Sequence, residues 1–188
     1  MFIVITGLDG SGTTSLAEKL HEMDKGSILL RTPSLEYCRE LIDKSVRETS
    51  PLAHYYFYLS SVIYMSDYIK KNCDYKNKNV YCVKYLIDTV VSHQEAGLDV
   101  KLDYETDGIL KPDLTVFVQL DEQIRQERIT KRGKSVFDKL LDDDKTRNNI
   151  YDRFKNLLDE NTVYFDNIEK DINKNAKALY EKITKFNM

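Results

Sequence analysis

Residues 2–20 read FIVITGLDGSGTTSLAEKL, and this stretch decides the fold. It opens with a short unbroken apolar run, which is typical of a buried parallel strand. Gly7, Gly10 and Gly12 follow at once, and apolar residues then recur at helical spacing from Leu16 onward. This order of strand, glycine-rich loop and helix is the context in which phosphate-binding loops occur.

The loop fits the pattern Gly-x-x-x-x-Gly-Lys-Ser/Thr, except that Thr13 occupies the lysine position. Backbone N–H groups of such a loop, with the helix N-terminus, point inward and bind phosphate oxygens. We expect Mg²⁺ to bind the hydroxyl of Thr14. The residues predicted to bind ATP phosphates are Gly7, Gly10, Ser11, Gly12, Thr13, Thr14 and Ser15. The alternative is an ordinary glycine-rich turn between a strand and a helix.

Losing the lysine threatens catalysis more than binding, because the backbone donors of the loop remain. Removing one preorganised donor typically lowers turnover by about 10²- to 10³-fold. A second basic cluster, IRQERITKRGK at 124–134, could supply the missing charge. At helical spacing its residues Arg125, Arg128 and Arg132 share one face. The cluster is interpreted either as part of a mobile cationic lid near 128–145 or as a solvated helix face.

The composition predicts one folded domain over residues 1–188, with 41% hydrophobic residues. A formal net charge of −3 excludes a general basic surface, so we expect no nucleic-acid partner. Because no apolar run is long enough to cross a membrane, we expect no membrane association and a cytoplasmic location. Cys38, Cys73 and Cys82 share no metal-ligand spacing and are predicted to be free thiols.

Alternating apolar runs and helical patterns predict an α/β fold, a three-layer α/β/α sandwich around a five-stranded parallel sheet. The expected strands are 2–6, 27–31, 79–84, 114–120 and 162–166. A long helix is expected from about Leu52 to Lys71, and a last helix from about Ile168 to Phe186. Ligands of such sheets bind at the carboxyl ends of the strands.

Taken together, these residues resemble the thymidylate kinase family, within the wider group of nucleoside monophosphate kinases. The resemblance covers most of the chain and is carried by the opening stretch at 2–20, RTP at 31–33, FYLSSV at 57–62, VKYLIDT at 83–89, PDLTVFVQLD at 112–121 and ERITKRG at 127–133. It implies a P-loop NTPase fold of the nucleoside monophosphate kinase type. It also implies ATP and Mg²⁺, transfer of the γ-phosphoryl group of ATP to dTMP, and a homodimer packed through helices.

The resemblance also implies roles for individual residues. Asp9 matches an acid near the acceptor sugar and phosphate, and it is one of the implied catalytic residues. Arg128 and Arg132 match catalytic arginines of the lid that clamp ATP. The implied acceptor-binding residues are Asp9, Arg31 on the acceptor phosphate, Phe57 stacked on the base, Lys84 and Tyr85 after the third strand, and Thr89 near the base.

The chain departs from the family pattern at several positions that handle phosphate or the base. Apart from Thr13, Val83 replaces an acid, Ser61 replaces an arginine, His93 occupies a glutamine position and Gln119 replaces an acid. Two alternatives therefore stay open beside phosphorylation of dTMP. One is a kinase of the same fold that acts on a different nucleotide, nucleoside or small metabolite. The other is a catalytically inactive nucleotide-binding or regulatory protein.

Overall fold

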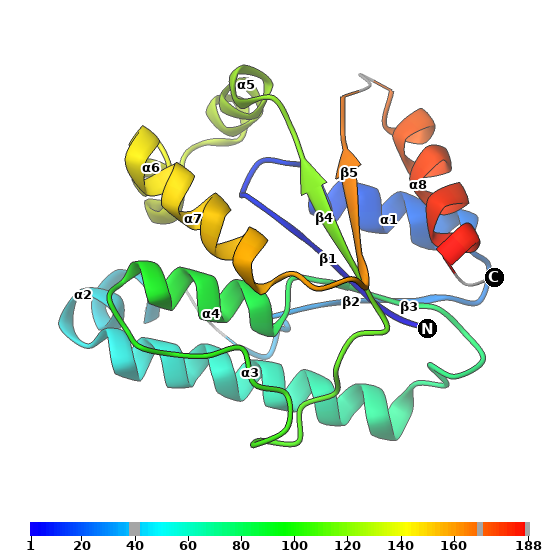
Figure 1. Cartoon of the computed structure of the whole chain (residues 1–188), viewed down its shortest axis with the longest axis horizontal. Helices are drawn as coiled ribbons and strands as arrows, with labels where there is room; N and C mark the ends of the chain where they lie inside the picture. Colours follow the sequence, from blue (N-terminus) through cyan, green and yellow to red (C-terminus); the bar gives the residue numbers. More distant parts are fainter. Residues whose placement is uncertain (38–41, 169–170, 187–188) are drawn as a thin grey trace.

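Five parallel strands form one sheet between two layers of helices in the computed structural model, which describes residues 1–37, 42–168 and 171–186 (Figure 1). The strand order is β2-β3-β1-β4-β5, so the strand that leads into the glycine-rich loop is central. All five predicted strands are confirmed: β1 (Phe2–Gly7), β2 (Ile28–Arg31), β3 (Val80–Val83), β4 (Leu114–Gln119) and β5 (Thr162–Asp166).

Helices cover both faces of the sheet, which explains why β1 reads as a continuous apolar run. Ile3 and Ile5 pack toward α1 (Thr13–Met23) and α8 (Ile172–Phe186). Phe2 and Val4 pack on the other face, toward α3 (Pro51–Asn72) and α4 (Leu86–Glu95). The remaining elements are η1, one π-helical turn (Ile42–Val46), α2 (Arg47–Thr49), α5 (Glu122–Arg132), α6 (Val136–Leu140) and α7 (Asp144–Leu157).

The bounds of the helices follow local capping. The long helix begins at Pro51, because the Ser50 hydroxyl accepts a hydrogen bond from the Ala53 amide at 3.2 Å and proline favours the first turn. The predicted start of the last helix at Ile168 is wrong, since α8 begins at Ile172. Asp171 accepts a hydrogen bond from a backbone N–H at this start. Residues 169 and 170 lie outside the described part.

Cys73 and Cys82 are free, as predicted, and both are buried, whereas Cys38 lies outside the described residues. Burial raises the pKa of Cys82 to about 12, so this thiol is protonated at neutral pH. Among the helices that the structure describes, none is both long enough and apolar enough to cross a membrane.

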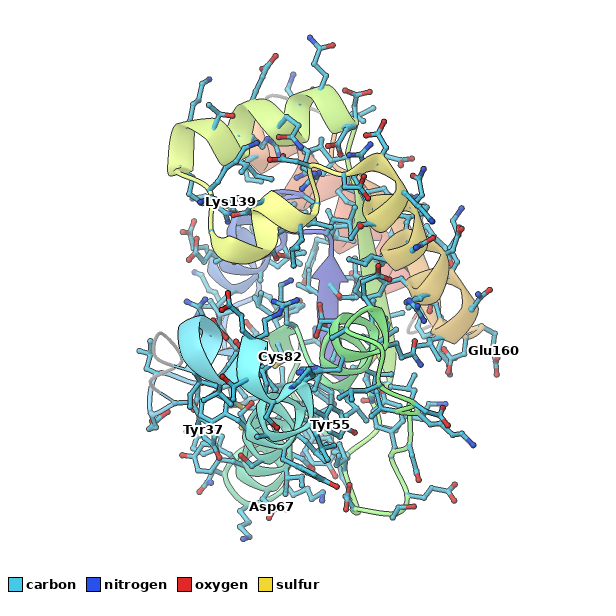
Figure 2. The ribbon with its side chains drawn as sticks, turned by 90° about the vertical axis from the view of Figure 1, so that its left-hand side faces the viewer. Tyr37, Tyr55, Asp67, Cys82, Lys139 and Glu160 are labelled. Carbon is cyan, nitrogen blue, oxygen red and sulfur yellow. The ribbon has the colours of Figure 1, made fainter. Side chains whose placement is uncertain are left out.

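The carboxyl ends of the central strands lie between two groups of helices. Figure 2 shows α6, which carries Lys139, above these strand ends and α3, which carries Asp67, below them. The glycine-rich loop leaves β1 at this edge of the sheet. The fold therefore places the loop where parallel α/β sheets bind their ligands.

Candidate active site

The glycine-rich loop needs its glycines for close packing as well as for backbone conformation. Gly12 has φ +97° and stands directly before α1, which begins at Thr13. A Cβ atom at Gly12 would lie 2.4 Å from Nδ2 of Asn167, and one at Gly10 would lie 2.7 Å from Cγ1 of Ile129. The loop is therefore enclosed by α5 and by the segment that follows β5.

A cavity of about 590 Å³ opens beside the loop, and we call it the loop cavity. Five of the predicted phosphate-binding residues line it, namely Gly10, Gly12, Thr13, Thr14 and Ser15. Four cationic residues face them, namely Arg31, Lys84, Arg128 and Arg132. Of the other two predicted residues, Gly7 lines the neighbouring cavity, and Ser11 is a buried residue of the loop itself.

The loop cavity fits a polyphosphate with its magnesium ion. Its cations supply positive charge that Thr13 cannot, and Thr14 and Ser15 are exposed toward the cavity. No group of three or more His, Cys, Asp or Glu side chains in the described ranges could hold a metal ion by itself. Nucleotide-bound Mg²⁺ does not need such a group, because phosphate oxygens and waters provide most of its ligands.

A second cavity of about 340 Å³, the helix cavity, lies next to the first, between α3, α4 and the strand ends. Its lining includes Asp43, Arg47, His54, Tyr58, Asp88 and Thr89. Asp9 and Lys84 line both cavities, so they form a shared wall. This arrangement can hold two ligands side by side with their ends meeting at Asp9 and Lys84.

The ammonium group of Lys84 lies between two carboxylates at this wall. Its Nζ lies 2.7 Å from Oδ1 of Asp9 and 3.6 Å from Oδ1 of Asp88. Lys84 has φ +62°, a conformation that non-glycine residues seldom adopt and that often marks a functional site. The Thr6 hydroxyl and the Tyr85 amide donate to Asp88. Burial raises the pKa of Asp88 above its ordinary value, and Lys84 and these hydrogen bonds oppose that rise.

Two histidines and an acid form a chain of hydrogen bonds at the helix cavity. His93 Nδ1 lies 2.6 Å from the Thr89 carbonyl, which only accepts, so Nδ1 carries the proton. Nε2 of His93 then accepts from Nδ1 of His54 at 2.7 Å. His54 Nε2 lies 3.1 Å from Oδ1 of Asp43, and the Tyr58 hydroxyl donates to the same oxygen. His93 is therefore a buried, hydrogen-bonded residue.

Replacing His93 by glutamine is expected to make the free energy of unfolding fall less steeply as the pH is lowered below neutral. Burial lowers the pKa of His93 from 6.5 to about 4, so the unfolded chain takes up this proton first as the pH falls. Stability from this group is complete above pH 6.5 and is lost toward pH 4, by up to about 3 kcal/mol. Urea unfolding at several pH values measures the difference. His21→Gln, at an exposed histidine of α1, is the matched control, and an unchanged slope in His93→Gln would contradict the assignment.

Only some of the predicted acceptor-binding residues line the helix cavity. Arg31 lines the loop cavity instead of the helix cavity. Phe57 lies outside the lining of the helix cavity, and its ring packs edge-to-face against Tyr37 and Tyr58, with centroids 5.5 Å apart in each case. Tyr85 lines the helix cavity, although its side chain is almost fully buried. Asp9, Lys84 and Thr89 do come together at this cavity, and their roles toward a ligand stay predictions.

The three arginines predicted to share one face of α5 separate into two kinds. Arg128 and Arg132 line the loop cavity, and their role toward ATP stays a prediction. Nη2 of Arg132 also donates to both carboxylate oxygens of the buried Asp138, at 2.9 and 2.8 Å. Arg125 instead turns beneath the loop and is 1% exposed. Movement of the segment near 128–145 stays a prediction.

Several polar residues of the site escaped the sequence analysis. Asp88 lies on α4, four residues after Lys84, and this spacing of opposite charges could have indicated an ion pair although Lys84 itself precedes the helix. Thr6, His54 and Asn167 carry no comparable signal, because their partners are distant in the sequence.

Comparisons of the sequence with known proteins identify the family of the chain. A family profile described as "Thymidylate kinase" matches residues 5–179. The thymidylate kinase of Mycoplasmoides gallisepticum is 30% identical over 151 residues, which cover 71% of this chain and 70% of that protein. The thymidylate kinase of Mycoplasmopsis pulmonis is 27% identical over 211 aligned positions, which cover 99% of this chain and 87% of that protein.

Solved structures of similar shape support the fold. Thymidylate kinase from Candida albicans superposes with a TM-score of 0.72 at 17% identity, covering 98% of this chain and 91% of that one. Thymidylate kinase from Ehrlichia chaffeensis gives a TM-score of 0.62 at 22% identity, covering 97% of this chain and 98% of that one.

Proposed function

Because this chain belongs to the thymidylate kinase family, we propose that it transfers the γ-phosphoryl group of MgATP to dTMP, giving ADP and dTDP. One observation carries the proposal beyond family membership. Two adjacent cavities share the wall formed by Asp9 and Lys84, and one of them opens on a glycine-rich loop with cations opposite. Direct transfer between two nucleotides requires such neighbouring sites.

The donor would bind in the loop cavity. Backbone N–H groups from Gly10 to Ser15 and the N-terminus of α1 would hold its phosphates. Mg²⁺ would neutralise charge on those phosphates, and the hydroxyl of Thr14, which lines the loop cavity, would hold the ion. Arg128 and Arg132 would stabilise the negative charge that spreads over the transferring group.

The acceptor would bind in the helix cavity with its phosphate toward the shared wall. Lys84 would attract that phosphate, and its ion pair with Asp9 fixes where the ammonium group lies. Phosphoryl transfer depends on alignment and on positive charge more than on covalent help from the protein. A cation shared by both cavities therefore lies where the reacting oxygens would meet.

The proposal is tested by measuring ADP formation from MgATP with dTMP, dUMP, dCMP, AMP and thymidine as separate acceptors. We expect dTMP to support the highest kcat/KM. Faster transfer to another acceptor would replace dTMP in the proposal while keeping a kinase. Calorimetric binding of MgATP without turnover on any acceptor would indicate an inactive nucleotide-binding protein.

We also propose a homodimer packed through α3. Exposed apolar side chains lie along this helix at Leu52, Tyr56, Tyr64 and Tyr68. Their aromatic surface would be covered by the same surface of a second copy. Light scattering at micromolar concentration should give the mass of a dimer for the wild type and of a monomer for Tyr56→Lys. A monomeric wild type would exclude this interface.

A further inference from the structure

Arg125, on α5, holds the phosphate-binding loop from outside. We propose that Arg125 is a positioning residue that fixes the loop conformation through the Asp9 carbonyl, so that the loop binds donor phosphates without a lysine at position 13. The inference rests on the proposed function only in taking a nucleotide as the ligand of the loop cavity.

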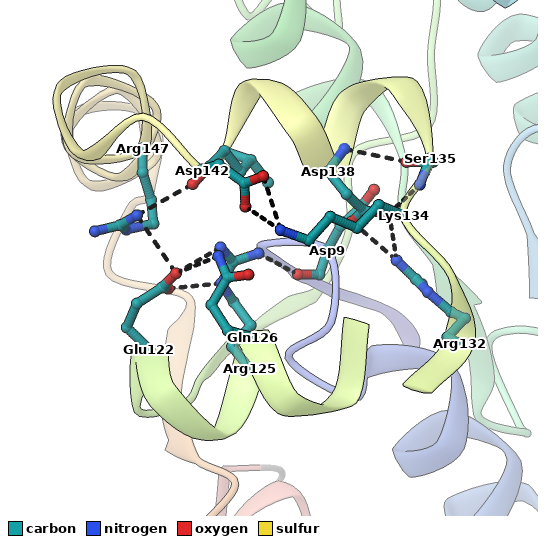
Figure 3. A network of polar contacts seen from close by, with 11 residues as sticks. Asp9, Glu122, Arg125, Gln126, Arg132, Lys134, Ser135, Asp138, Asp142 and Arg147 are labelled. Carbon is teal, nitrogen blue, oxygen red and sulfur yellow. Dashed lines mark hydrogen bonds and ion pairs between the residues drawn. The ribbon is translucent and has the colours of Figure 1, made fainter. Parts of the chain in front are cut away.

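The contact with the loop is direct. Nη1 of Arg125 donates to the backbone carbonyl of Asp9 at 2.8 Å, and the arginine is 1% exposed (Figure 3). A Cβ atom added at Gly10 would lie 3.1 Å from Cγ of Arg125, so the side chain packs tightly under the loop. The hydrogen bond is charge-assisted and screened from water, which makes it stronger than an exposed one.

The guanidinium group is itself fixed by Glu122, one helical turn earlier. Its Nε and Nη2 donate to the two carboxylate oxygens at 2.7 and 2.8 Å. Arg147, on α7, lies 3.4 Å from the same carboxylate, and Gln126 donates to it at 2.8 Å. Although burial alone would raise it, these bonds and charges hold the pKa of Glu122 below its ordinary value. The bidentate geometry leaves Arg125 one orientation, toward the loop.

Neighbouring contacts show that the loop is held at more than one point. The Ser11 carbonyl accepts from Nδ2 of Asn167 at 2.7 Å and from Nη1 of Arg128 at 3.5 Å. Asp9 is fixed twice, because its carbonyl bonds to Arg125 and its carboxylate pairs with Lys84. Arg125 therefore acts through Asp9 on the wall between the two cavities.

Energetic coupling between substitutions at positions 13 and 125 distinguishes this role from that of a buried ion pair that only stabilises the fold. Thr13 lines the loop cavity, so Thr13→Lys would add a cation on the phosphate side of the same loop. If Arg125 compensates for the absent lysine, the new lysine should matter most when Arg125 is missing. Two unrelated contributions would instead be additive.

The experiment measures the Kd of MgATP by titration calorimetry, with no acceptor present, and the thermal unfolding midpoint of each variant. Arg125→Met should weaken MgATP binding by about 10- to 100-fold, the effect of losing a hydrogen bond from a charged group. Thr13→Lys should tighten MgATP binding by a much larger factor in Arg125→Met, where it recovers most of the loss, than in the wild type. Gln123→Ala, at an exposed position of the same helix, is the control.

Equal effects of Thr13→Lys in both backgrounds would overturn the inference, as would a lower unfolding midpoint with an unchanged Kd. If Arg125→Met does not fold, Arg125→Lys takes its place, since it keeps the charge while losing the bidentate geometry. Because binding is measured without an acceptor, the outcome is separate from the proposed function. The expected coupling without transfer to dTMP would leave the inference standing and reject that function. If the wild type phosphorylates dTMP but Arg125→Met binds MgATP as tightly as the wild type, the proposed function stands and the inference about Arg125 is rejected.

Discussion

Gly12→Ala is expected to weaken MgATP binding and to lower kcat/KM by about 100-fold or more. The added Cβ would lie 2.4 Å from Nδ2 of Asn167 and 3.1 Å from Nη1 of Arg128. Asn167 is fully buried and donates to the Ser11 carbonyl, so it cannot move aside without breaking that bond. The φ of +97° adds backbone strain of about 1–2 kcal/mol. Calorimetry with MgATP and an ADP-release assay measure the two losses.

Gly26→Ala is the matched control for this substitution. Gly26 has φ +95°, but a Cβ atom there would have nothing within 4 Å. The two variants therefore share the backbone strain, while only one disturbs the loop. Gly26→Ala should lose similar stability in urea and keep its affinity for MgATP. Binding within about 3-fold of wild type in Gly12→Ala would show that the enclosed loop can relax, contrary to this expectation.

Lys84→Met is expected to lower kcat/KM for the acceptor by about 10²- to 10³-fold, the size typical of losing one preorganised charge at a reacting group. The variant would lose the ion pair with Asp9 and the weaker pair with Asp88. Two carboxylates would then face an anionic ligand with less opposing charge. Because Lys84 lowers the pKa of Asp88, its removal should also raise that pKa further. Steady-state kinetics with varied acceptor and fixed MgATP measure the loss.

Lys84→Arg keeps the charge at the same backbone position and should recover activity to within about 10-fold of wild type. MgATP binding should change less than acceptor kinetics in both variants, since other cations also line the loop cavity. Equal losses in Lys84→Met and Lys84→Arg would mean that the shape of the lysine, and not its charge, is what the wall requires.

The fold could be predicted from the sequence because its signals are local. Each strand is a short apolar run, and the glycine-rich loop directly follows one of them. The start of α8 was predicted too early because an apolar residue at 168 extends the helical spacing, whereas the chain first reaches a capping acid at Asp171. Periodicity describes which residues face the core and says little about where a helix is capped.

The interior of the site could be predicted only in part. Helical spacing placed Arg125 with Arg128, but it could not show that packing of α5 against Gly10 turns Arg125 under the loop. The partnership of His54 with His93 joins residues that are 39 positions apart. Such contacts depend on tertiary packing, so a single sequence carries no periodic signal for them.

Glu122 forms ion pairs with arginines of two helices, because Arg125 lies on α5 and Arg147 lies on α7 (Figure 3). Any substitution of this acid would leave the buried guanidinium group of Arg125 without its carboxylate partner, whereas Arg147 would keep its ion pair with Asp144. A variant that replaces Glu122 by an uncharged residue would therefore have to change Arg125 as well. The region should consequently resist alteration by single steps, in evolution or in the laboratory, more strongly than its surface position on α5 would indicate.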